Sequence, residues 1–496
     1  MRKIFRFLTI GLSLGFCCFS SHAQEQATKI TLTLNQTLDM ARQQSPDVLV
    51  ARHSFRSSYW NYTYYKANYL PSVTFTSTPN FDHSINVIPM ADGTSQYVQQ
   101  NQLITDGSIS ISQNVPLTGG TLSLKSSLQR LDLFGDNKAT SYRSNPLTVA
   151  YEQALFGYNK LKWDRKIEPI RYEAAKKEYL ETLELVSVKA ITRFFNLAKA
   201  QTNLEIARTN YANADTLYTF AKGRYNIGTI TENEMLQLEI NRLNEETNMM
   251  SAQIEVDNNT EELRSYLGIK DAVEIEVIVE DAVPQLIIQQ QQALQLALDN
   301  SPDILNMERR KKESESSVAI AKSNAGLKAD IFAQFGLTQT ADEFSSAYKK
   351  PLNQQYVEIG IRLPILDWGR GKGQIRVAKS NRDVVYAQVE QELTNFEMNV
   401  IKIVKQFNLQ GSKVSLAAKT NNTASRRNEV ARRLYILGKS TILDLNAAIS
   451  EKDAAKRNYI NTLYDYWSLY YTLQSMTLYN FEKNIPLTED YTLLLK

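Results

Sequence analysis

Apolar residues recur every three or four positions along most of the chain, a spacing typical of helices that pack as coiled coils. One long helix is expected over residues 163–225, with a shorter partner over residues 231–266. A second pair is expected over about 373–437 and 441–478. At 1.5 Å per residue the longest of these helices spans roughly 95 Å. Helices of that length do not fit a compact core, so the pattern favours long antiparallel coiled coils.

Shorter segments between the helices alternate apolar and polar residues with a period of two. The clearest examples lie at residues 147–152 and 357–363. A strand that crosses a membrane in a barrel needs this alternation over about ten residues. A soluble sheet that packs on one face gives the same pattern, so the alternation alone leaves both structures open.

The chain contains two copies of one unit. The motif around Ser45-Pro46-Asp47 recurs 256 positions later around Ser301-Pro302-Asp303. The segment that ends at Gly228 recurs 210 positions later and ends at Gly438. Two constant offsets, each held over a long segment, indicate an internal two-fold repeat. The change of offset gives the first copy 46 extra residues, which lie between Phe75 and Val149.

The repeat divides the chain into regions of expected structure. Repeat one covers residues 24–268, a linker in a mixed equatorial region covers 269–290, repeat two covers 291–478, and a tail covers 479–496. Each repeat has the order helix, strands, long helix, tip, helix. We expect the strands at about 72–156 and 327–366, and the tips at 224–231 and 434–441. The first helix is expected to run from about Leu34 to Tyr69 without a break.

The 46 extra residues have the pattern of one more hairpin, over about 106–134. Alternating residues flank a turn signal at residues 116–120. Two added strands keep the strand count even, so the chain still leaves the sheet on the side where it entered. We therefore expect six strands per subunit. A loop folded outside a sheet of four strands is the alternative.

The first 23 residues have the features of a secretory signal peptide. Basic residues at 2, 3 and 6 precede an apolar run over 7–19, and Ser21-His22-Ala23 is a cleavage signal. The run is too short for a transmembrane anchor. A lipoprotein would need a small residue before Cys17, where Phe16 stands. We expect cleavage after Ala23 and no lipid on the mature chain.

The composition argues against several classes of function. The three bases of the signal segment account for the formal charge of +3, so the remainder is balanced and offers no electrostatic case for nucleic acid. Both cysteines lie in that segment, and only His53 and His83 follow it, so no metal site or cofactor is expected. Residues 369–373 are glycine-rich but lack the spacing of a phosphate-binding loop. We find no catalytic motif and expect no enzyme.

The arrangement resembles that of the TolC-type outer-membrane efflux proteins over essentially the whole chain after residue 23. The features that carry the resemblance are the paired Leu-x-x-Ala-x-x-x-Ser-Pro starts and the tips Arg224-Tyr225-x-x-Gly228-Thr229 and Tyr435-x-x-Gly438. The segment from Leu363 to Gly369 is similar to the strand-to-helix crossing of that family.

The resemblance implies an α+β fold, in which a membrane β-barrel built from strands of several subunits continues as a long α-helical coiled-coil barrel. It implies a homotrimer in the bacterial outer membrane, in contact with outer-membrane lipid and extending into the periplasm. It also implies docking to a periplasmic adaptor protein and to an inner-membrane pump of the RND or ABC type. Independently of the resemblance, unpaired sheet edges are excluded from hydrocarbon, so the two edges of the sheet are expected to pair with strands of other subunits. Six strands per subunit would give about eighteen per trimer, against twelve without the hairpin.

The two tips carry the candidate site residues. Thr231-x-x-Glu234 and Thr441-x-x-Asp444 have the form of capping boxes. By resemblance, Asp444 matches the constriction acid of the family. Three copies of the Asp444 carboxylate around one axis would repel one another. This repulsion would raise their pKa values, and their negative charge would attract cations. A second acid of the family falls at Ala447 here, so the ring is expected to be weaker.

The resemblance also implies a latch and a docking surface. Glu234 and Tyr435 match positions that pair between neighbouring helices in the family. The expected adaptor-docking residues at the two tips are Gly228, Thr229, Gly438, Lys439 and Ser440.

The function expected from these features is that of a passive exit duct for small molecules, such as drugs and toxic compounds, or for exported substrates. The alternative is a periplasmic coiled-coil adaptor or structural tether. An adaptor would show one helical hairpin, whereas this sequence has two, each interleaved with amphipathic strands. Extraction with the outer-membrane fraction would favour the duct, and a soluble periplasmic pool would favour the tether.

Overall fold

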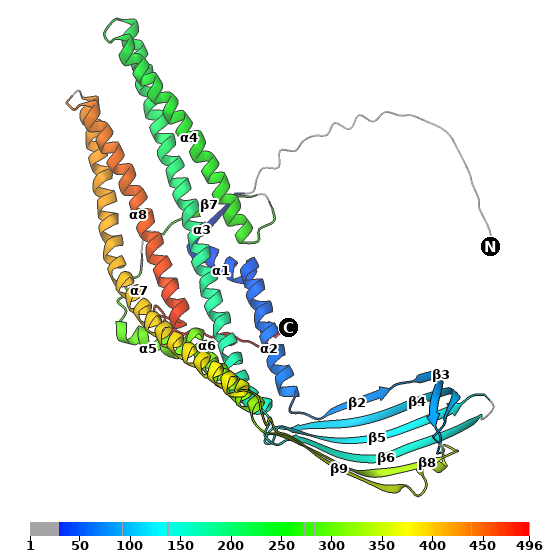
Figure 1. The fold of residues 1–496 in the computed structure, drawn as a ribbon. Coiled ribbons are helices and arrows are strands. Elements are labelled where there is room, and N and C mark those ends of the chain that lie inside the picture. The colour runs from blue at the N-terminus through cyan, green and yellow to red at the C-terminus, as the bar shows by residue number, and fades with distance from the viewer. Residues whose placement is uncertain are drawn as a thin grey trace, which may run out of the picture.

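The structure is a computed structural model that describes residues 29–91, 93–135, 138–271, 273–280, 283–437 and 439–495. The expected signal peptide and Gly438 lie outside the described residues. A curved sheet forms one end of the elongated molecule, and two helical hairpins form the other (Figure 1).

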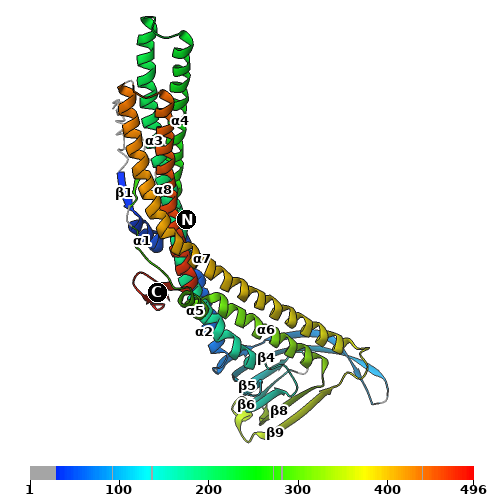
Figure 2. The same ribbon diagram turned by 90° about the vertical axis from the view of Figure 1, so that its left-hand side faces the viewer.

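Two helices of 67 residues each run through most of the molecule. They are α3 (Lys160–Asn226) and α7 (Arg370–Ile436), and they turn back into α4 (Glu232–Tyr266) and α8 (Ile442–Thr477). In the half away from the sheet, α3 packs against α4 and α8, and α7 packs against α8 (Figure 2). The helices therefore form a layer in the order α4, α3, α8, α7, with α4 and α7 at its open edges.

Four shorter helices complete the half nearer the sheet. They are α1 (Leu34–Gln44), α2 (Pro46–Ala67), α5 (Gln290–Asn300) and α6 (Pro302–Ala325). The prediction of one unbroken helix from Leu34 to Tyr69 is wrong, because α1 ends before Ser45 and α2 starts at Pro46. Proline has no amide hydrogen and disfavours a helical conformation in the residue before it. The Ser45 hydroxyl accepts a hydrogen bond from the amide of Val48 and so caps the second helix.

The main hydrophobic core lies at the middle of the molecule, where α1, α3, α5, α7 and α8 meet. Phe194, Phe407 and Tyr466 are among its largest fully buried side chains. A two-stranded parallel sheet covers part of this core, with strands β1 (Lys29–Thr33) and β7 (Glu274–Ile278).

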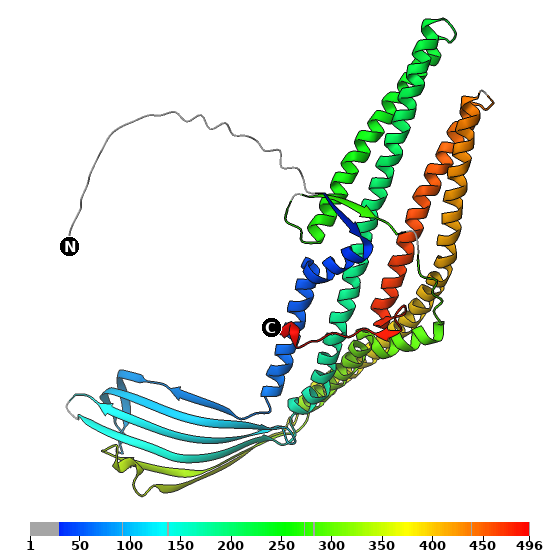
Figure 3. The ribbon, with the colours of Figure 1, turned by 180° about the vertical axis from the view of Figure 1, so that it is seen from behind.

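The tail after α8 returns toward α2 and α3 (Figure 3). It contains the short strands β10 (Tyr479–Asn480) and β11 (Ile485–Pro486) and a 3₁₀ turn, η2 (Leu493–Leu495). Leu494 packs against Phe55 and Tyr179 in a second, smaller core.

The large sheet is antiparallel, with the strand order β2-β4-β5-β6-β8-β9. Its strands are β2 (Ser72–Ser77), β4 (Ser95–Val115), β5 (Gly120–Leu133), β6 (Ala139–Ala154), β8 (Lys328–Ala341) and β9 (Leu352–Arg362). A further strand, β3 (Asn80–Pro89), pairs with β4 in the register that β2 begins, since Ser77 faces Gly107 and Asn80 faces Ile104. Strands β2 and β3 thus form one edge strand with a break at Pro79, which has no amide to donate.

The hairpin expected over about 106–134 corresponds to β4 and β5, which lie within the sheet between the β2/β3 edge and β6. Strand β4 begins at Ser95, eleven residues before the expected start of the hairpin. The tight turn ends with Gly119, whose φ of +80° favours glycine. A short 3₁₀ turn, η1 (Ser346–Tyr348), lies in the connection from β8 to β9.

Candidate functional site at the helix tips

The tip between α3 and α4 is closed by backbone geometry that requires glycine. Gly228 has a φ of +73°, and its amide donates to the carbonyl of Tyr225 at 2.9 Å. The amide and hydroxyl of Thr229 both donate to the carbonyl of Arg224, each at 2.9 Å. Among the described residues, no neighbouring atom lies within 4 Å of the position that a Cβ on Gly228 would take. Gly228 and Thr229 therefore shape an open, exposed turn.

Helix α4 then begins with the expected capping box. The Glu234 amide donates to the Thr231 hydroxyl at 3.3 Å, and the Thr231 amide donates to Glu234 Oε2 at 2.9 Å. Each residue satisfies a backbone donor that the first helical turn leaves open. This confirms the cap that the sequence predicts.

The tip between α7 and α8 has a more elaborate cap centred on Asp444. The Asp444 amide donates to the Thr441 hydroxyl at 3.1 Å. In return, Asp444 Oδ2 accepts from the Thr441 hydroxyl at 2.7 Å and from the Thr441 amide at 3.3 Å. The Ser440 hydroxyl adds a longer bond of 3.4 Å to the same oxygen. The amide of Lys439 donates to the carbonyl of Leu434 at 2.9 Å, which closes the end of α7.

These bonds keep the Asp444 carboxylate charged. The hydroxyl and amide of Thr441 hold the pKa of Asp444 below its usual value, because they donate to the ionised form. Within one chain the shift is thus opposite to the rise expected from a ring of three carboxylates, which requires other copies. Asp444 is exposed and negatively charged at neutral pH.

The single chain does not bring the two proposed latch residues together. The hydrogen bond described for the Glu234 side chain goes to Thr231 of its own turn, while Tyr435 is half-buried near the end of α7. The two tips are separate, and the α3–α4 tip extends beyond the α7–α8 tip (Figures 1 and 3). Glu234 and Tyr435 therefore belong to two separate tips of the described chain.

A polar layer that was not predicted from the sequence lies between the hairpins. Asp453 of α8 is only 4% exposed, and its Oδ2 accepts from Asn210 Nδ2 of α3 at 3.2 Å. Arg457, one turn further along α8, donates to Asn203 of α3 at 2.9 Å. A polar cavity of about 400 Å³ borders this layer. The seam of α8 has no apolar residue between Ile449 and Tyr459 other than alanine, and this gap was the available signal.

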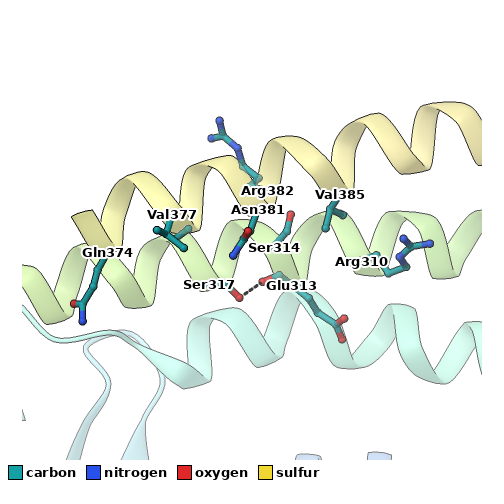
Figure 4. Close-up of a pocket in the computed structure, with 10 residues that line it drawn as sticks. Arg310, Glu313, Ser314, Ser317, Gln374, Val377, Asn381, Arg382 and Val385 are labelled. Atoms are coloured by element: carbon teal, nitrogen blue, oxygen red, sulfur yellow. Dashed lines mark hydrogen bonds between the residues drawn. The ribbon is translucent and has the colours of Figure 1, made fainter. Parts of the chain in front are cut away.

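A larger groove of about 540 Å³ lies between α6 and α7, in the half next to the sheet (Figure 4). Several of its polar groups already have partners. Arg310 of α6 forms an ion pair with Glu392 of α7. The Ser317 hydroxyl donates to the carbonyl of Glu313 at 3.0 Å, and Arg382 Nη2 donates to Asp383 at 2.7 Å. In Figure 4 Arg382 points away from Ser317. The charged side chains that line the groove are thus paired with neighbouring side chains.

Two further features concern the described part of the chain. Within it, no group of three or more His, Cys, Asp or Glu side chains is arranged to hold a metal ion. No helix among the described residues is both long and apolar enough to cross a membrane.

Comparisons with known proteins identify both the fold and the family. Residues 37–269 and 293–477 match the family described as outer membrane efflux protein. No curated protein sequence matches the chain at a significant level.

Solved structures with a similar fold include the CmeC outer membrane channel of Campylobacter jejuni, with a TM-score of 0.64 and 15% identity over 93% of this chain and 88% of that chain. The outer membrane protein VceC of Vibrio cholerae has a TM-score of 0.60 and 14% identity over 92% of this chain and 97% of that chain. The open state of the MtrE outer membrane channel of Neisseria gonorrhoeae has a TM-score of 0.52 and 15% identity over 90% of this chain and 88% of that chain.

The family match covers both repeats, including the strands and the two tips, and it argues against an adaptor or tether. The chain therefore belongs to the outer membrane efflux protein family, and it lies in the bacterial outer membrane and extends into the periplasm.

Proposed function

We propose that three copies of this chain form a passive, water-filled exit duct through which a tripartite efflux or secretion system releases small molecules. The observation that carries the proposal is the large sheet, which has one apolar face and two unpaired edges. The pump of such a system would supply the energy, and the duct would open and close at its periplasmic tips.

The two faces of the sheet differ across five of its strands. The register aligns an apolar row across five strands, through Val73, Ile111, Leu124, Val149 and Phe335. These five side chains are all exposed. The adjacent row on the opposite face consists of Ser72, Ser112, Ser123, Ala150 and Gln334. A barrel wall with lipid outside and water inside requires this division.

The edges support closure by three subunits. The β2/β3 edge and β9 each leave a row of backbone groups without a partner strand among the described residues. Such edges are excluded from hydrocarbon, so neighbouring copies must pair them. With six strands from each chain, a trimer would have about eighteen.

The edge helix α4 has an unpartnered seam of its own. Its exposed apolar residues follow coiled-coil spacing and are Leu236, Ile240, Leu243, Met250 and Ile254. The other edge of the helical layer is α7. We infer that α4 of one copy packs against α7 of the next, which closes the helices into a tunnel above the barrel.

The tips are suited to docking and gating. The family works with periplasmic adaptors and inner-membrane pumps, and we propose Gly228, Thr229, Gly438, Lys439 and Ser440 as the docking residues. Three copies of Asp444 would form a charged ring at the closed end, and Glu234 would bond to Tyr435 of a neighbouring copy. Opening would separate the tips. The hydrogen bonds of Asp453 would then be replaced by hydrogen bonds to water, which costs less free energy than exposing an apolar seam.

Thiol accessibility tests the wall assignment of the inserted hairpin. Leu124→Cys lies on the apolar face of β5 and Ser123→Cys lies next to it on the polar face, so the pair is matched. We expect a membrane-impermeant maleimide to modify Ser123→Cys through the lumen in vesicles and to leave Leu124→Cys unmodified. Equal modification of both would show that the hairpin is a loop in water.

Deletion of residues 95–133 tests the strand count. It removes β4 and β5 and leaves the β2/β3 edge antiparallel to β6. Because barrel diameter grows with strand number, a barrel of about twelve strands should have roughly half the cross-section. We expect lower conductance in bilayers once the gate is open. A stable trimer with unchanged conductance would contradict six strands in the wall.

Bilayer recordings of Asp444→Ala and Asp444→Asn test the gate. If the ring closes the duct, both variants should show larger conductance and weaker cation selectivity or divalent block. Glu232→Gln is the control, since it removes an acid from the first turn of α4 without touching the cap. Lower thermal stability with unchanged conductance would leave Asp444 only its capping role.

A further inference from the structure

The two connections from the sheet to the long helices expose large apolar side chains. After β9, Ile365 is 92% exposed and Trp368 is 88% exposed. After β6, Leu155 is 47% exposed and Phe156 is 55% exposed. Isolated apolar residues on a surface are ordinary, but contiguous patches mark an interaction site.

The backbone at Trp368 adds a second unfavourable feature. Its φ is +53°, a left-handed conformation that is unusual for a bulky residue. The Asp367 carboxylate stabilises this turn by accepting from the amides of Gly369 at 2.9 Å and Gly371 at 2.8 Å. The fold therefore holds a tryptophan out into the surroundings, where water would be a poor solvent for it.

Bases follow these apolar residues at matching positions of the two connections. Lys160 and Lys162 stand 210 positions before Arg370 and Lys372. Residues 160–166 and 370–379 together contain eight bases and one acid, although the whole chain is nearly balanced. Neither long helix has an acid in its first turn. Lys160 forms an ion pair with Asp164 one turn further along α3. Bases at a helix N-terminus oppose the helix dipole, so the dipole gives no reason for Lys162, Arg370 and Lys372 to stand there.

We propose that these residues form a collar that binds the anionic headgroups of phospholipids in the periplasm-facing leaflet. The collar consists of Lys162, Trp163, Trp368, Arg370 and Lys372. It rests on the proposed function, because it requires the apolar face of the sheet to lie in a bilayer.

Continuity and charge identify lipid as the occupant. The collar directly follows β6 and β9, so its apolar side chains extend the apolar face of the sheet toward the periplasm. Lysine and arginine stems lie along apolar surface while their charged ends reach phosphate. Tryptophan prefers the same interface. The collar would fix the height and tilt of the duct in the membrane.

Tryptophan fluorescence tests the location of the collar. The chain has four tryptophans, and Trp467 lies in α8, far from the sheet. One variant keeps only Trp368 (Trp60→Phe, Trp163→Phe, Trp467→Phe) and the matched control keeps only Trp467. In vesicles with brominated acyl chains, we expect quenching of Trp368 and none of Trp467. Equal quenching of the two would overturn the location.

Lipid competition tests the role of the bases. In vesicles that mix phosphatidylglycerol and phosphatidylcholine, we expect Trp368 to be quenched preferentially when the brominated lipid is phosphatidylglycerol. The attraction of a single base to an anionic surface would give about a fivefold preference for phosphatidylglycerol over phosphatidylcholine. Lys162→Gln, Arg370→Gln and Lys372→Gln together should abolish the preference.

The matched control changes three exposed bases elsewhere on α7, by Lys419→Gln, Arg426→Gln and Arg432→Gln, and should keep the preference. A preference that survives in the collar variant, or is absent in the parent protein, would overturn anionic lipid binding. Conductance of the same preparation distinguishes this failure from failure of the duct. Protein that neither conducts nor shows quenching of Trp368 would contradict the proposed function itself.

Discussion

The central helices and the large sheet contain similar apolar residues in opposite surroundings. In the helices Phe407 is 1% exposed, whereas Phe335 of the sheet is 52% exposed. Conversely, buried residues of the sheet strands, such as Ser144, Thr148 and Gln153, are small or polar. The hydrophobic effect stabilises the helical region in water, but it cannot stabilise this sheet there. The comparison indicates that the two regions are built for different solvents.

The largest expected difference comes from truncating one phenylalanine in each region. Phe407→Ala should destabilise the helical region by about 3–5 kcal/mol, because it leaves a cavity in a packed core. Phe335→Ala removes a side chain that faces outward and should cost less than about 1 kcal/mol in detergent micelles. Chemical unfolding followed by circular dichroism measures both. Equal losses would contradict the distinction between the regions.

Lysine substitutions at two neighbouring positions of β6 test the faces of the sheet. Val149→Lys places a charge on the apolar face and should cost about 2–4 kcal/mol per chain in a bilayer. Ala150→Lys points to the opposite face and should cost much less. The fraction of protein that inserts into vesicles reports the difference. Similar insertion of the two variants would remove the argument for a lipid-facing side.

The helical region should also show a pH dependence that arises from burial. Burial raises the pKa of Glu181 to about 7, with a further contribution from Asp303 and Glu178. The folded state then binds the proton more tightly than the unfolded chain, so stability falls as pH rises from about 4.5 to 7 and the loss is complete above pH 7.

Removing this ionisable group should remove the dependence. Glu181→Gln should raise stability by about 1–3 kcal/mol at pH 8 and leave it unchanged at pH 4. Glu390→Gln, at an exposed position of α7, is the control. Thermal unfolding at both pH values measures the effect. A gain in stability that is equal at pH 4 and pH 8 would show that the raised pKa of Glu181 is not its cause.

The smallest expected effect compares the two tips. Thr231→Ala and Thr441→Ala each remove a cap, at a cost of about 1 kcal/mol. The loss should be larger at Thr441, whose hydroxyl also donates to Asp444. Hydrogen exchange of the first turns of α4 and α8 measures the two losses locally. A larger loss at Thr231 would contradict the role of that additional bond.

Local patterns explain why much of the fold could be predicted. The ends of α3, α4, α7 and α8 lie within three residues of the expected ranges, because helical periodicity and capping depend on nearby residues. Both capping boxes were readable for the same reason. The break at Ser45-Pro46 was also readable, and it was missed because the apolar period continues through it.

The remainder depends on contacts between distant residues. Strand β4 begins at Ser95 because it pairs with β3, and no local pattern specifies that partner. Asp453 is polar in sequence and buried in the structure, because Asn210 of another helix accommodates it. The meeting of Glu234 and Tyr435 remains a prediction that involves a second copy.

The sequence by itself determined the long helices, the alternation of the strands and the capped tips, since each follows from spacing within a few turns or residues. Only the tertiary structure decided the strand order, the single edge formed by β2 and β3, and the side-by-side packing of α3 and α8. These features depend on which distant surfaces exclude solvent together. A periodic pattern states that a surface is apolar, but it does not state what will cover it.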